Sequence, residues 1–422
     1  MEKAKIITCG CRFNRYESDE IKERLNPAGE RKLVIINSCA VTSKSEAKSR
    51  YAVRRAVKEN PGAAIVVGGC WAELDPEAVK AIEGVDLVLG NEEKFRVNEF
   101  GADKNGETEV HTGAVKAATD FIESRVGGLT GRTAAYLKIQ NGCGEICSFC
   151  VVRIARGKSR SATPEFVQRR IDELADGGAR EIVLTGINIG EYGNDIPGAP
   201  TLASILKRGA KRKDVRFRLS SINPREVTEE LIAVISDNEN ICKHLHIPMQ
   251  SGSDAVLKRM NRPYTADDYK RKIEMVAAAL PDAGIGCDIL AGFPGETEEE
   301  FSETAEMLAS LPFSYAHVFT YSDRPQSTAH GFDGKLAENV KKERMLHLKS
   351  IADEKNRLFR ERFIGKRLSI LVEEKSTKAG HLKGKSDNFI SVEIDGGGAV
   401  RGSLIEITAE SLTETGLRGK IA

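Results

Sequence analysis

Short apolar segments alternate with helix-like segments twice along this chain, and this alternation limits the folds that its 422 residues can adopt. Short buried strands separated by helices are typical of parallel sheets covered on both faces. In the first series the strand-like runs are Lys5–Cys9, Leu33–Asn37, Ala64–Val67 and Val85–Leu89, and the helix-like stretches are Tyr16–Leu25, Ser45–Lys58 and Pro76–Ile82. We therefore expect residues 1–100 to form a parallel α/β domain.

The second series of strands and helices predicts an open barrel over residues 132–355. Its strand-like runs are Ala135–Ile139, Glu181–Thr185, Phe217–Ser220, His244–Met249, Ile285–Ala291 and Ala316–Tyr321. Six such units fall short of the eight that close a TIM barrel, so we predict a partial, TIM-like (βα)6 barrel. A long charged helix is expected at about Val340–Phe363, and the polar, glycine-rich residues 101–131 are expected to be a linker.

The pattern changes again in residues 360–422. Alternating apolar and polar residues at Leu368–Val372, Phe389–Ile394 and Leu404–Thr408 predict strands separated by glycine-rich turns. Such a succession of short strands is typical of a small all-β barrel. The sequence therefore predicts an α/β protein of three domains with an all-β barrel at its C-terminal end.

The composition excludes several classes of protein. A formal net charge of +1 excludes a globally basic nucleic-acid binder, so any basic surface must be local. The chain has no apolar run long enough to span a membrane and no signal-peptide pattern at its start, which predicts the cytoplasm and no membrane partner. In that reducing compartment, nine cysteines indicate metal ligation or catalysis rather than disulfides.

Three cysteines with C-x3-C-x2-C spacing follow the first predicted barrel strand: Cys143, Cys147 and Cys150. Structural zinc sites and ferredoxin clusters generally use four protein ligands, so three thiolates leave one metal position open. Barrel folds place their chemistry at this end of the strands. The spacing predicts a 4Fe–4S cluster that binds and cleaves S-adenosylmethionine to a radical. The alternative is a zinc knuckle that takes its fourth ligand from elsewhere.

The ends of the other predicted barrel strands carry residues suited to a bound nucleoside and amino acid. Glycines allow close backbone approach, an arginine can bind a carboxylate with two hydrogen bonds, and the phenylalanine before the last cysteine offers a ring to adenine. The candidate S-adenosylmethionine-binding residues are Phe149, Gly186, Asn188, Arg218, Ser220, Gln250, Asp288 and Gly292.

A second set of cysteines follows three different strands of the N-terminal sheet: Cys11, Cys39 and Cys70. Residues just past the ends of parallel strands converge on one edge of a sheet, so these thiols are candidate ligands of a second cluster. Buried, inert thiols are the alternative. Cys9 lies two residues before Cys11 and remains a competing ligand, because strand residues two apart share a face. Cys242 and Cys287 lie in apolar segments and are expected in the core.

Local groups of basic residues indicate an RNA partner. One group follows the Cys143–Cys150 loop, a second lies within residues 207–213, and a third lies in the predicted C-terminal barrel. Small β barrels bind single-stranded RNA through such faces. For each group, a solvated surface without a partner is the alternative. The candidate RNA-binding residues are Arg153, Arg156, Lys158, Arg160, Lys366, Arg367, Lys383 and Lys385.

Over nearly all of its length the chain resembles radical S-adenosylmethionine methylthiotransferases. The resemblance rests on Gly10–Asn14, Asn37–Thr42, Gly69–Cys70, Leu137–Cys143, His246–Ser253 and Gly292–Thr297. It implies an N-terminal auxiliary-cluster domain, a central radical domain, a C-terminal RNA-binding TRAM domain, two 4Fe–4S clusters and S-adenosylmethionine as cofactors. In this family the first auxiliary ligand follows a glycine and precedes an asparagine by three residues, which selects Cys11 over Cys9.

Within the family the chain is most similar to the MtaB-like branch, which acts on N6-threonylcarbamoyladenosine at position 37, beside the tRNA anticodon. This implies hydrogen removal from adenine C2, sulfur insertion and methyl transfer, with the tRNA anticodon stem-loop, an electron donor such as flavodoxin or ferredoxin, and a sulfur source as partners. Related branches act on isopentenyladenosine in tRNA or on a ribosomal-protein aspartate, and these are the alternatives. A non-catalytic iron–sulfur or zinc RNA-binding protein is the third hypothesis.

Overall fold

The computed structural model describes residues 4–25, 32–100, 107–124, 133–375, 381–395 and 398–422, and the chain divides into two compact units. The first unit comprises Met1–Val126, Gln140–Ser161 and Ser322–Gly331. The second comprises Gly127–Ile139, Ala162–Tyr321 and Phe332–Ala422. The segment that carries Cys143, Cys147 and Cys150 therefore belongs to the same compact unit as the N-terminal sheet.

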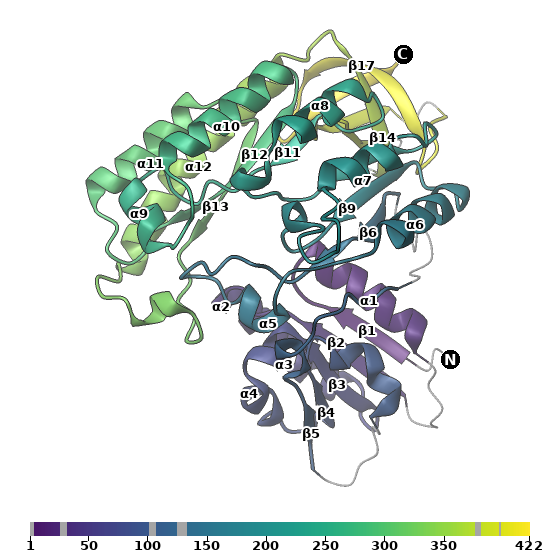
Figure 1. Ribbon diagram of the computed structural model, residues 1–422, viewed down its shortest axis with the longest axis vertical. Helices are drawn as coiled ribbons and strands as arrows, with labels where there is room; N and C mark the ends of the chain where they lie inside the picture. The colour runs from purple at the N-terminus through teal and green to yellow at the C-terminus, as the bar shows by residue number, and fades with distance from the viewer. Residues whose placement is uncertain (1–3, 26–31, 101–106, 125–132, 376–380, 396–397) are drawn as a thin grey trace. The chain divides into compact units, whose positions relative to one another are not determined.

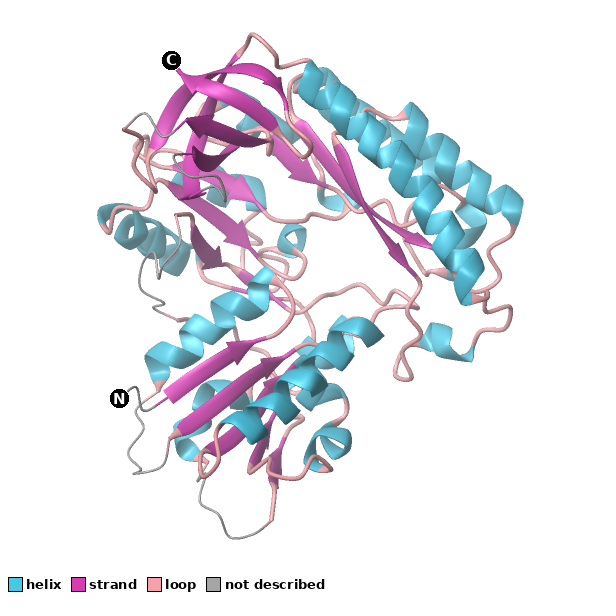
Figure 2. Cartoon of the chain, turned by 180° about the vertical axis from the view of Figure 1, so that it is seen from behind, coloured by secondary structure: helices cyan, strands magenta, loops and turns pink. Residues whose placement is uncertain are grey.

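The first unit is built on a five-stranded parallel sheet, ordered as in the chain (Figures 1 and 2). Its strands are β1 (Ala4–Thr8), β2 (Leu33–Ser38), β3 (Ala64–Gly69), β4 (Leu87–Leu89) and β5 (Glu109–His111). The predicted parallel α/β arrangement is confirmed. In register, Ala4 lies opposite Leu33 and Leu33 opposite Ala64, so the strands end at nearly the same level.

Helices cover both faces of this sheet because its buried strands present apolar side chains alternately to each side. On one face, Ile21 of α1 (Arg12–Arg24) packs with Ile35 and Val66. On the other face, Val53 of α2 (Ser43–Glu59) packs with neighbours that include Val67. The two helices therefore bury the apolar side chains on opposite faces of β2 and β3.

One part of the predicted linker is wrong. Within residues 101–131, the described stretch 107–124 contains β5, which adds the fifth strand to the sheet beside β4, while 101–106 and 125–131 lie outside the described residues. β5 has three residues, one of them exposed, and it lies at an edge, so it lacks the apolar run by which buried strands are found in a sequence.

Short elements complete the first unit. They are α3 (Cys70–Leu74), α4 (Pro76–Lys80), the 3-10 helices η1 (Glu93–Glu99), η2 (Ala114–Lys116) and η5 (Thr328–Gly331), the strands β7 (Gln140–Asn141) and β8 (Arg160–Ser161), and α5 (Val152–Arg156). Of these, α3 begins at Cys70, and β7 and α5 flank the Cys143–Cys150 loop. β7 and β8 pair antiparallel, so they close the loop that carries Cys143, Cys147 and Cys150 at its base.

The second unit contains six parallel strands in two sheets of three: β6 (Ala135–Lys138), β9 (Glu181–Thr185), β10 (Arg216–Leu219), β11 (His244–His246), β12 (Gly284–Ala291) and β13 (Tyr315–Thr320). A single parallel bridge between Phe217 and Ile241 joins the two sheets. Among the described residues the two outer strands, β6 and β13, do not pair, so the barrel is not closed. The predicted partial barrel is confirmed.

Helices and 3-10 turns alternate with these strands: α6 (Pro164–Asp176), η3 (Ile189–Glu191), α7 (Leu202–Gly209), η4 (Pro224–Glu226), α8 (Glu229–Asp237), α9 (Asp254–Arg259), α10 (Ala266–Ala279), α11 (Glu298–Ser310) and α12 (Glu338–Glu361). Five of these helices are preceded by an N-cap threonine whose side chain accepts a hydrogen bond from a first-turn amide: Thr163, Thr201, Thr228, Thr265 and Thr297. Such a cap stabilises a helix by about 1 kcal/mol. None of the helices in the described part of the chain combines the length and the apolar character needed to cross a bilayer.

The C-terminal residues form the predicted small all-β barrel, whose strands lie beside the C-terminus in Figure 2. The barrel is closed in the order β14-β15-β16-β18-β17. Its strands are β14 (Arg367–Lys375), β15 (His381–Ser386), β16 (Ser391–Asp395), β17 (Leu404–Leu412) and β18 (Leu417–Ile421). Two of these five strands, β15 and β18, were not predicted. β15 reads HLKGKS, and its lysines and glycine hide the strand pattern.

A buried ion-pair cluster joins the open barrel to the C-terminal barrel within the second unit. The Glu181 carboxylate accepts from Arg216 Nε at 2.5 Å and from Arg218 Nε at 3.0 Å. The two guanidinium groups also donate to backbone carbonyls of the C-terminal barrel, those of Ser369, Lys385, Ser386 and Asp387. Burial alone would raise the pKa of Glu181, but the two arginines outweigh it and lower this pKa to about 2.

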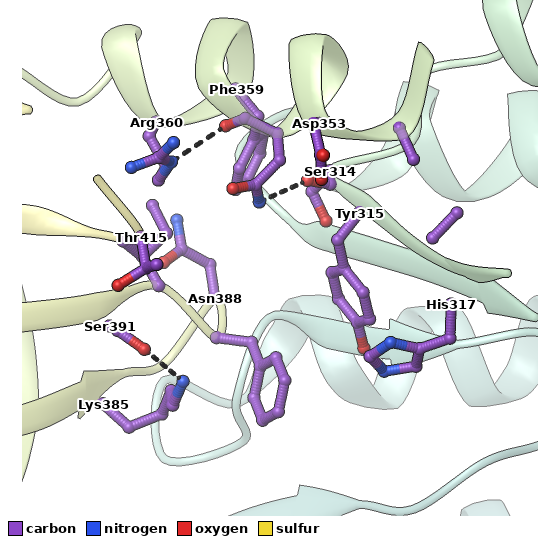
Figure 3. Close-up of a pocket in the computed structure, with 15 residues that line it drawn as sticks. Ser314, Tyr315, His317, Asp353, Phe359, Arg360, Lys385, Asn388, Ser391 and Thr415 are labelled. Atoms are coloured by element: carbon purple, nitrogen blue, oxygen red, sulfur yellow. Dashed lines mark hydrogen bonds between the residues drawn. The ribbon is translucent and has the colours of Figure 1, made fainter. Parts of the chain in front are cut away.

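A pocket of about 260 Å³ lies between β13, the end of α12 and the C-terminal barrel (Figure 3). Tyr315 and Phe389 supply aromatic walls, and the Phe389 ring stacks on His244 with 4.3 Å between ring centroids. The Lys385 amino group lies over the Phe389 ring and donates to Ser391 Oγ at 2.7 Å. The pocket therefore combines ring faces with a cation.

Candidate active site

The structure brings the segments that carry Cys11, Cys39 and Cys70 together at one edge of the N-terminal sheet. A Cβ added to Gly10 would lie only 2.6 Å from Cys39 Sγ, so the chain before Cys11 passes directly against Cys39. The Ser38 hydroxyl accepts hydrogen bonds from the amides of Trp71 and Ala72, which ties the Cys39 strand to the helix that Cys70 begins. The predicted convergence of the three positions is therefore present in the structure.

Cys9 and Cys11 have different surroundings, although they are two residues apart. The Cys9 side chain packs against the apolar cluster under α2, and burial raises the pKa of its thiol. Cys11 is exposed, and its sulfur lies 4.0 Å from Asn14 Oδ1. These positions favour Cys11 as the ligand, with Cys9 as a core residue. Cys242 and Cys287 are buried, as predicted for core residues.

Three thiols and nearby donors fit an iron–sulfur cluster at this edge. Burial, together with the neighbouring thiols of Cys70 and Cys11, raises the pKa of Cys39 to about 11. A metal replaces the proton of such a thiol and removes the repulsion between thiolates. The Asn91 side-chain amide donates to Cys70 Sγ at 3.6 Å, a contact that stabilises sulfur in its charged or cluster-bound form.

Replacing Gly10 with alanine should remove the auxiliary cluster. The new methyl group would lie 2.4 Å from Cys39 Cβ, and the position has a φ of +88°, so Cys39 must move. The parent protein reconstituted under anaerobic conditions should hold about eight irons per chain, and the Gly10→Ala variant about four. Iron and sulfide analysis measures this directly.

Gly62→Ala is a matched control for this variant. Gly62 has a φ of +79°, so alanine carries a similar backbone strain of about 1–2 kcal/mol there, yet its new methyl group meets no atom within 4 Å. The Gly62→Ala protein should keep about eight irons. Equal iron loss in both variants would show that strain, and not the approach to Cys39, is responsible.

The Cys143–Cys150 loop is held in a defined conformation by its own backbone. The Cys143 amide donates to the Gly157 carbonyl at 3.2 Å, and the Cys150 amide donates to the Cys147 carbonyl at 3.1 Å. The Val152 amide donates to Cys150 Sγ at 3.4 Å, which favours the thiolate. All three cysteines are half-buried, so a cluster bound here keeps one side accessible.

Two further contacts brace this loop from outside. The Arg153 guanidinium donates to the carbonyls of Cys143 and Gly144, and the Ala329 amide donates to the Ser148 carbonyl at 2.7 Å. Phe149, the candidate adenine contact, is half-buried beside Cys150. Three thiols on a braced loop fit the cluster that the spacing predicts.

Most candidate S-adenosylmethionine-binding residues lie where predicted, at the carboxyl ends of strands in the second unit. Gly186 and Asn188 follow β9, and Ser220 follows β10, with its amide donating to the Leu184 carbonyl at 3.0 Å. The Ser220 hydroxyl oxygen is buried and has no hydrogen-bond partner among the described residues. A buried hydroxyl of this kind fits a site that a polar ligand completes.

The loop after β11 contacts the neighbouring strand β12. The Gln250 amide donates to the Asp288 carbonyl at 2.8 Å, with a φ of +67° at Gln250, and the Asp288 carboxylate lies 3.1 Å from His246 Nε2. Gly292 has a φ of +75°, and its amide donates to Glu296 Oε2 at 2.9 Å. Candidate residues of neighbouring strands are therefore side by side.

The prediction for Arg218 is wrong. Its guanidinium is buried against Glu181 and the carbonyls of Ser386 and Asp387, so it is already neutralised and cannot bind the carboxylate of S-adenosylmethionine in this arrangement. Arg218 lies near the carboxyl end of β10, as predicted, but its guanidinium is directed to the C-terminal barrel and not to a ligand site.

The predicted RNA contacts of Arg156 and Arg160 are also contradicted. Each side chain is 2% exposed and paired with a carboxylate, Arg156 with Glu17 and Arg160 with Glu92. Lys158, between them, is exposed. The other candidates reach the surface at least in part: Arg153, Lys366, Arg367, Lys383 and Lys385.

Sequence reasoning missed Glu17 and Lys94, two charged residues beside the auxiliary cysteines. Both are fully buried, and Lys94 Nζ donates to Glu17 Oε2 at 2.6 Å. A signal existed for Glu17: it shares with Phe13 and Ile21 the buried face of α1, where an apolar residue is expected. A charge at such a position is costly unless it is paired.

Two family models match different parts of the chain. Residues 3–90 match the model described as Uncharacterized protein family UPF0004, and residues 137–308 match the Radical SAM superfamily. The threonylcarbamoyladenosine tRNA methylthiotransferase MtaB of Bacillus subtilis is 36% identical, covering 96% of this chain and 93% of the relative. The chain belongs to the radical S-adenosylmethionine methylthiotransferase family. Such methylthiotransferases carry two 4Fe–4S clusters and use S-adenosylmethionine.

Other relatives of this methylthiotransferase also match over nearly their whole length. MtaB of Thermotoga maritima is 36% identical, covering 99% of this chain and 96% of the relative. The tRNA-2-methylthio-N(6)-dimethylallyladenosine synthase of Fusobacterium nucleatum is 32% identical and covers all of both chains. Among solved structures, the radical S-adenosylmethionine methyltransferase TsrM of Kitasatospora setae superposes with a TM-score of 0.56 at 15% identity, covering 78% of this chain and 77% of that chain, which is a likeness of fold alone.

Proposed function

We propose that this methylthiotransferase converts N6-threonylcarbamoyladenosine at position 37 of tRNA, 3′ of the anticodon, to its 2-methylthio derivative. The observation that carries the chemistry is the presence of two separate sets of three cysteines in one compact unit, one on a braced loop and one at a sheet edge. The choice of nucleoside is supported by the MtaB relatives, which are 32–36% identical, whereas the dimethylallyladenosine synthases are 30–32% identical.

Each cysteine set has one task in this proposal. Cys143, Cys147 and Cys150 hold the cluster that, with S-adenosylmethionine, supplies a radical able to remove hydrogen from adenine C2, a carbon that acid–base chemistry does not activate. Gly186, Asn188, Ser220, Gln250, Asp288 and Gly292 hold S-adenosylmethionine at the strand ends. Cys11, Cys39 and Cys70 hold the auxiliary cluster at which sulfur is made available to that carbon.

The C-terminal barrel is the proposed TRAM-type RNA-binding part. Its pocket beside β13 presents the rings of Tyr315 and Phe389 together with Lys385, and single-stranded RNA binds to surfaces that combine aromatic rings with cations (Figure 3). Lys366, Arg367 and Lys383, which are also at least partly exposed, are the further proposed RNA contacts. The expected partners are the tRNA anticodon stem-loop, an electron donor and a sulfur source, in the cytoplasm.

Nucleoside analysis of tRNA tests the substrate. In cells that lack this protein, the 2-methylthio derivative of N6-threonylcarbamoyladenosine should be absent by mass spectrometry, with the unmodified precursor accumulating and returning to normal on complementation. If the methylthio derivative of isopentenyladenosine is lost instead, the substrate is isopentenyladenosine in tRNA. Unchanged tRNA with a missing methylthio group on a ribosomal-protein aspartate would reject the tRNA substrate.

A further inference from the structure

A buried arginine links the Cys143–Cys150 loop segment to the auxiliary cysteines. Arg156, on the short helix α5 that follows Cys150, donates from Nη1 to Glu17 Oε1 at 2.8 Å and from Nη2 to Glu17 Oε2 at 2.9 Å. The same Nη2 donates to Asn14 Oδ1 at 2.7 Å. Because Glu17 and Asn14 lie on α1, the helix that Cys11 precedes, one guanidinium joins the two cysteine-bearing segments.

The helix of Arg156 is also packed on the helix of Cys70. α5 contacts α3, whose first residue is Cys70. The Asn91 side chain donates to the Ala155 carbonyl at 2.6 Å and to Cys70 Sγ at 3.6 Å, so one amide contacts both α5 and the cysteine. Arg156 therefore lies in a fixed position relative to the auxiliary cysteines.

The charge of Arg156 acts on all three of these cysteines. Its guanidinium interacts electrostatically with Cys70 and Cys11 as well as with Cys39. Arg156 is 2% exposed, and its partner Glu17 is 0% exposed, so water does not screen the pair. Burial lowers the pKa of Lys94, whereas the pKa of Arg156 is raised because Cys70 and Glu17 outweigh burial. Arg156 is therefore a cation held beside the cysteines, and Lys94 is a second basic group that shares the Glu17 carboxylate, which it contacts at 2.6 Å.

We propose that Arg156 is a positioning residue that raises the reduction potential of the auxiliary cluster and anchors the radical-cluster loop to it. This inference rests on the proposed function in one respect, namely that Cys11, Cys39 and Cys70 hold a 4Fe–4S cluster. Reduction adds one electron to the cluster, and a fixed positive charge in a medium of low dielectric stabilises the more negative, reduced state. Glu17 orients the guanidinium and partly offsets its charge.

The sign of the effect distinguishes tuning from a purely structural ion pair. Arg156→Met removes the cation and leaves the Glu17 carboxylate, so the midpoint potential should fall. Glu17→Gln removes the anion and leaves the cation, so the potential should rise. An ion pair with only a structural role predicts loss of stability in both variants and no opposite shifts in potential.

The measurement uses the full chain in which Cys143, Cys147 and Cys150 are all replaced by alanine, so that only the auxiliary cluster titrates. The cluster is reconstituted anaerobically and titrated with dithionite, with its electron paramagnetic resonance signal as the readout. Opposite shifts for Arg156→Met and Glu17→Gln are expected. Equal potentials in the parent and both variants, or shifts of the same sign, overturn the proposal.

Two further variants keep the test interpretable if Arg156→Met folds poorly. Arg156→Lys keeps a positive charge but loses the two parallel contacts to Glu17. The midpoint potential of the auxiliary cluster in this variant should therefore stay near that of the parent, while residues 152–156 exchange their amide hydrogens faster. Arg160→Met is the control for a neighbouring buried cation. Arg160 is equally buried and pairs with Glu92, and its Nη2 donates to the Arg156 backbone carbonyl at 2.9 Å, so this variant removes a nearby charge but keeps the Arg156 guanidinium; it should leave the potential unchanged. A shift with Arg160→Met as large as that with Arg156→Met overturns the specific role of Arg156.

The outcome does not depend on which RNA or protein the enzyme modifies. If no auxiliary cluster assembles in the parent chain, the proposed role of Cys11, Cys39 and Cys70 fails. If the cluster assembles but neither variant shifts its potential, the role of Arg156 fails alone. A nucleoside analysis that rejects the tRNA substrate leaves both results standing.

Discussion

Replacing Cys143 with alanine should abolish 5′-deoxyadenosine formation, whereas replacing Cys39 should leave it intact and abolish methylthiolated product. The two cysteines lie in different sets, Cys143 on the loop closed by β7 and β8 and Cys39 at the end of β2. A cluster that lacks one of its three thiolate ligands is not held by the protein. Each substitution therefore removes one cluster and the reaction step that depends on it. The expected loss of the corresponding product is complete in each variant.

The test incubates each reconstituted variant with S-adenosylmethionine, dithionite and tRNA, and quantifies 5′-deoxyadenosine and methylthiolated nucleoside in the same reaction. Cys9→Ala is the matched control, because Cys9 lies two residues from Cys11 but packs in the apolar cluster under α2. This control should form both products. Loss of 5′-deoxyadenosine in the Cys39 variant contradicts the division of tasks, and loss of the auxiliary cluster in the Cys9 variant contradicts the choice of Cys11.

Glu181→Gln should destabilise the union of the open barrel with the C-terminal barrel by about 3–5 kcal/mol, the usual cost of removing one partner from a buried ion pair. The change leaves the guanidinium groups of Arg216 and Arg218 buried without their shared carboxylate. Urea unfolding followed by circular dichroism, with limited proteolysis after α12, measures the loss. Glu165→Gln is the control, because that carboxylate is 75% exposed and lies 3.8 Å from its arginine. It should change stability by less than about 0.5 kcal/mol.

The effect of Glu181→Gln should also depend on pH in a defined direction. The pKa of Glu181 is lowered from 4.5 to about 2 in the folded protein, so its carboxylate stabilises the fold above pH 4.5. That stabilisation disappears as the pH falls from 4.5 toward 2, where the parent carboxyl group also becomes protonated. The stability difference between parent and variant should therefore shrink over this range, and a difference that stays constant would show that the charge of Glu181 is not its source.

The sequence was a good guide to the sheets and to the cysteines, because both depend on local patterns. Apolar runs separated by amphipathic helices predict parallel strands, and the ends of parallel strands meet at one edge whatever the rest of the chain does. Cys11, Cys39 and Cys70 therefore lie as predicted, and so does the candidate series from Gly186 to Gly292, with the exception of Arg218.

The basic residues show where such inference stops. Arginine is mostly exposed in proteins, so a run such as Arg153–Arg160 reads as a surface patch. Arg156 is buried because its partner Glu17 lies 139 positions away in the sequence, and Arg218 is buried because the C-terminal barrel covers it with carbonyl groups. Neither partner is visible from the local pattern, which explains why both predictions failed for the same physical reason.

The first unit is assembled from three separate stretches of chain, and this has a consequence for how such proteins can be recombined. An exchange of N-terminal segments between two relatives, joined within the stretch Gly127–Ile139, would combine the Glu17 of one parent with the Arg156 of the other. In such a hybrid, the Arg156 segment of one parent must still form its hydrogen bonds with Glu17, Asn14 and Asn91 of the other parent. The segments that should come from one parent are therefore the N-terminal sheet, residues 140–161 and Ser322–Gly331. A crossover after residue 161 keeps the Glu17–Arg156 pair intact, and a second exchange is needed to keep Ser322–Gly331 with it.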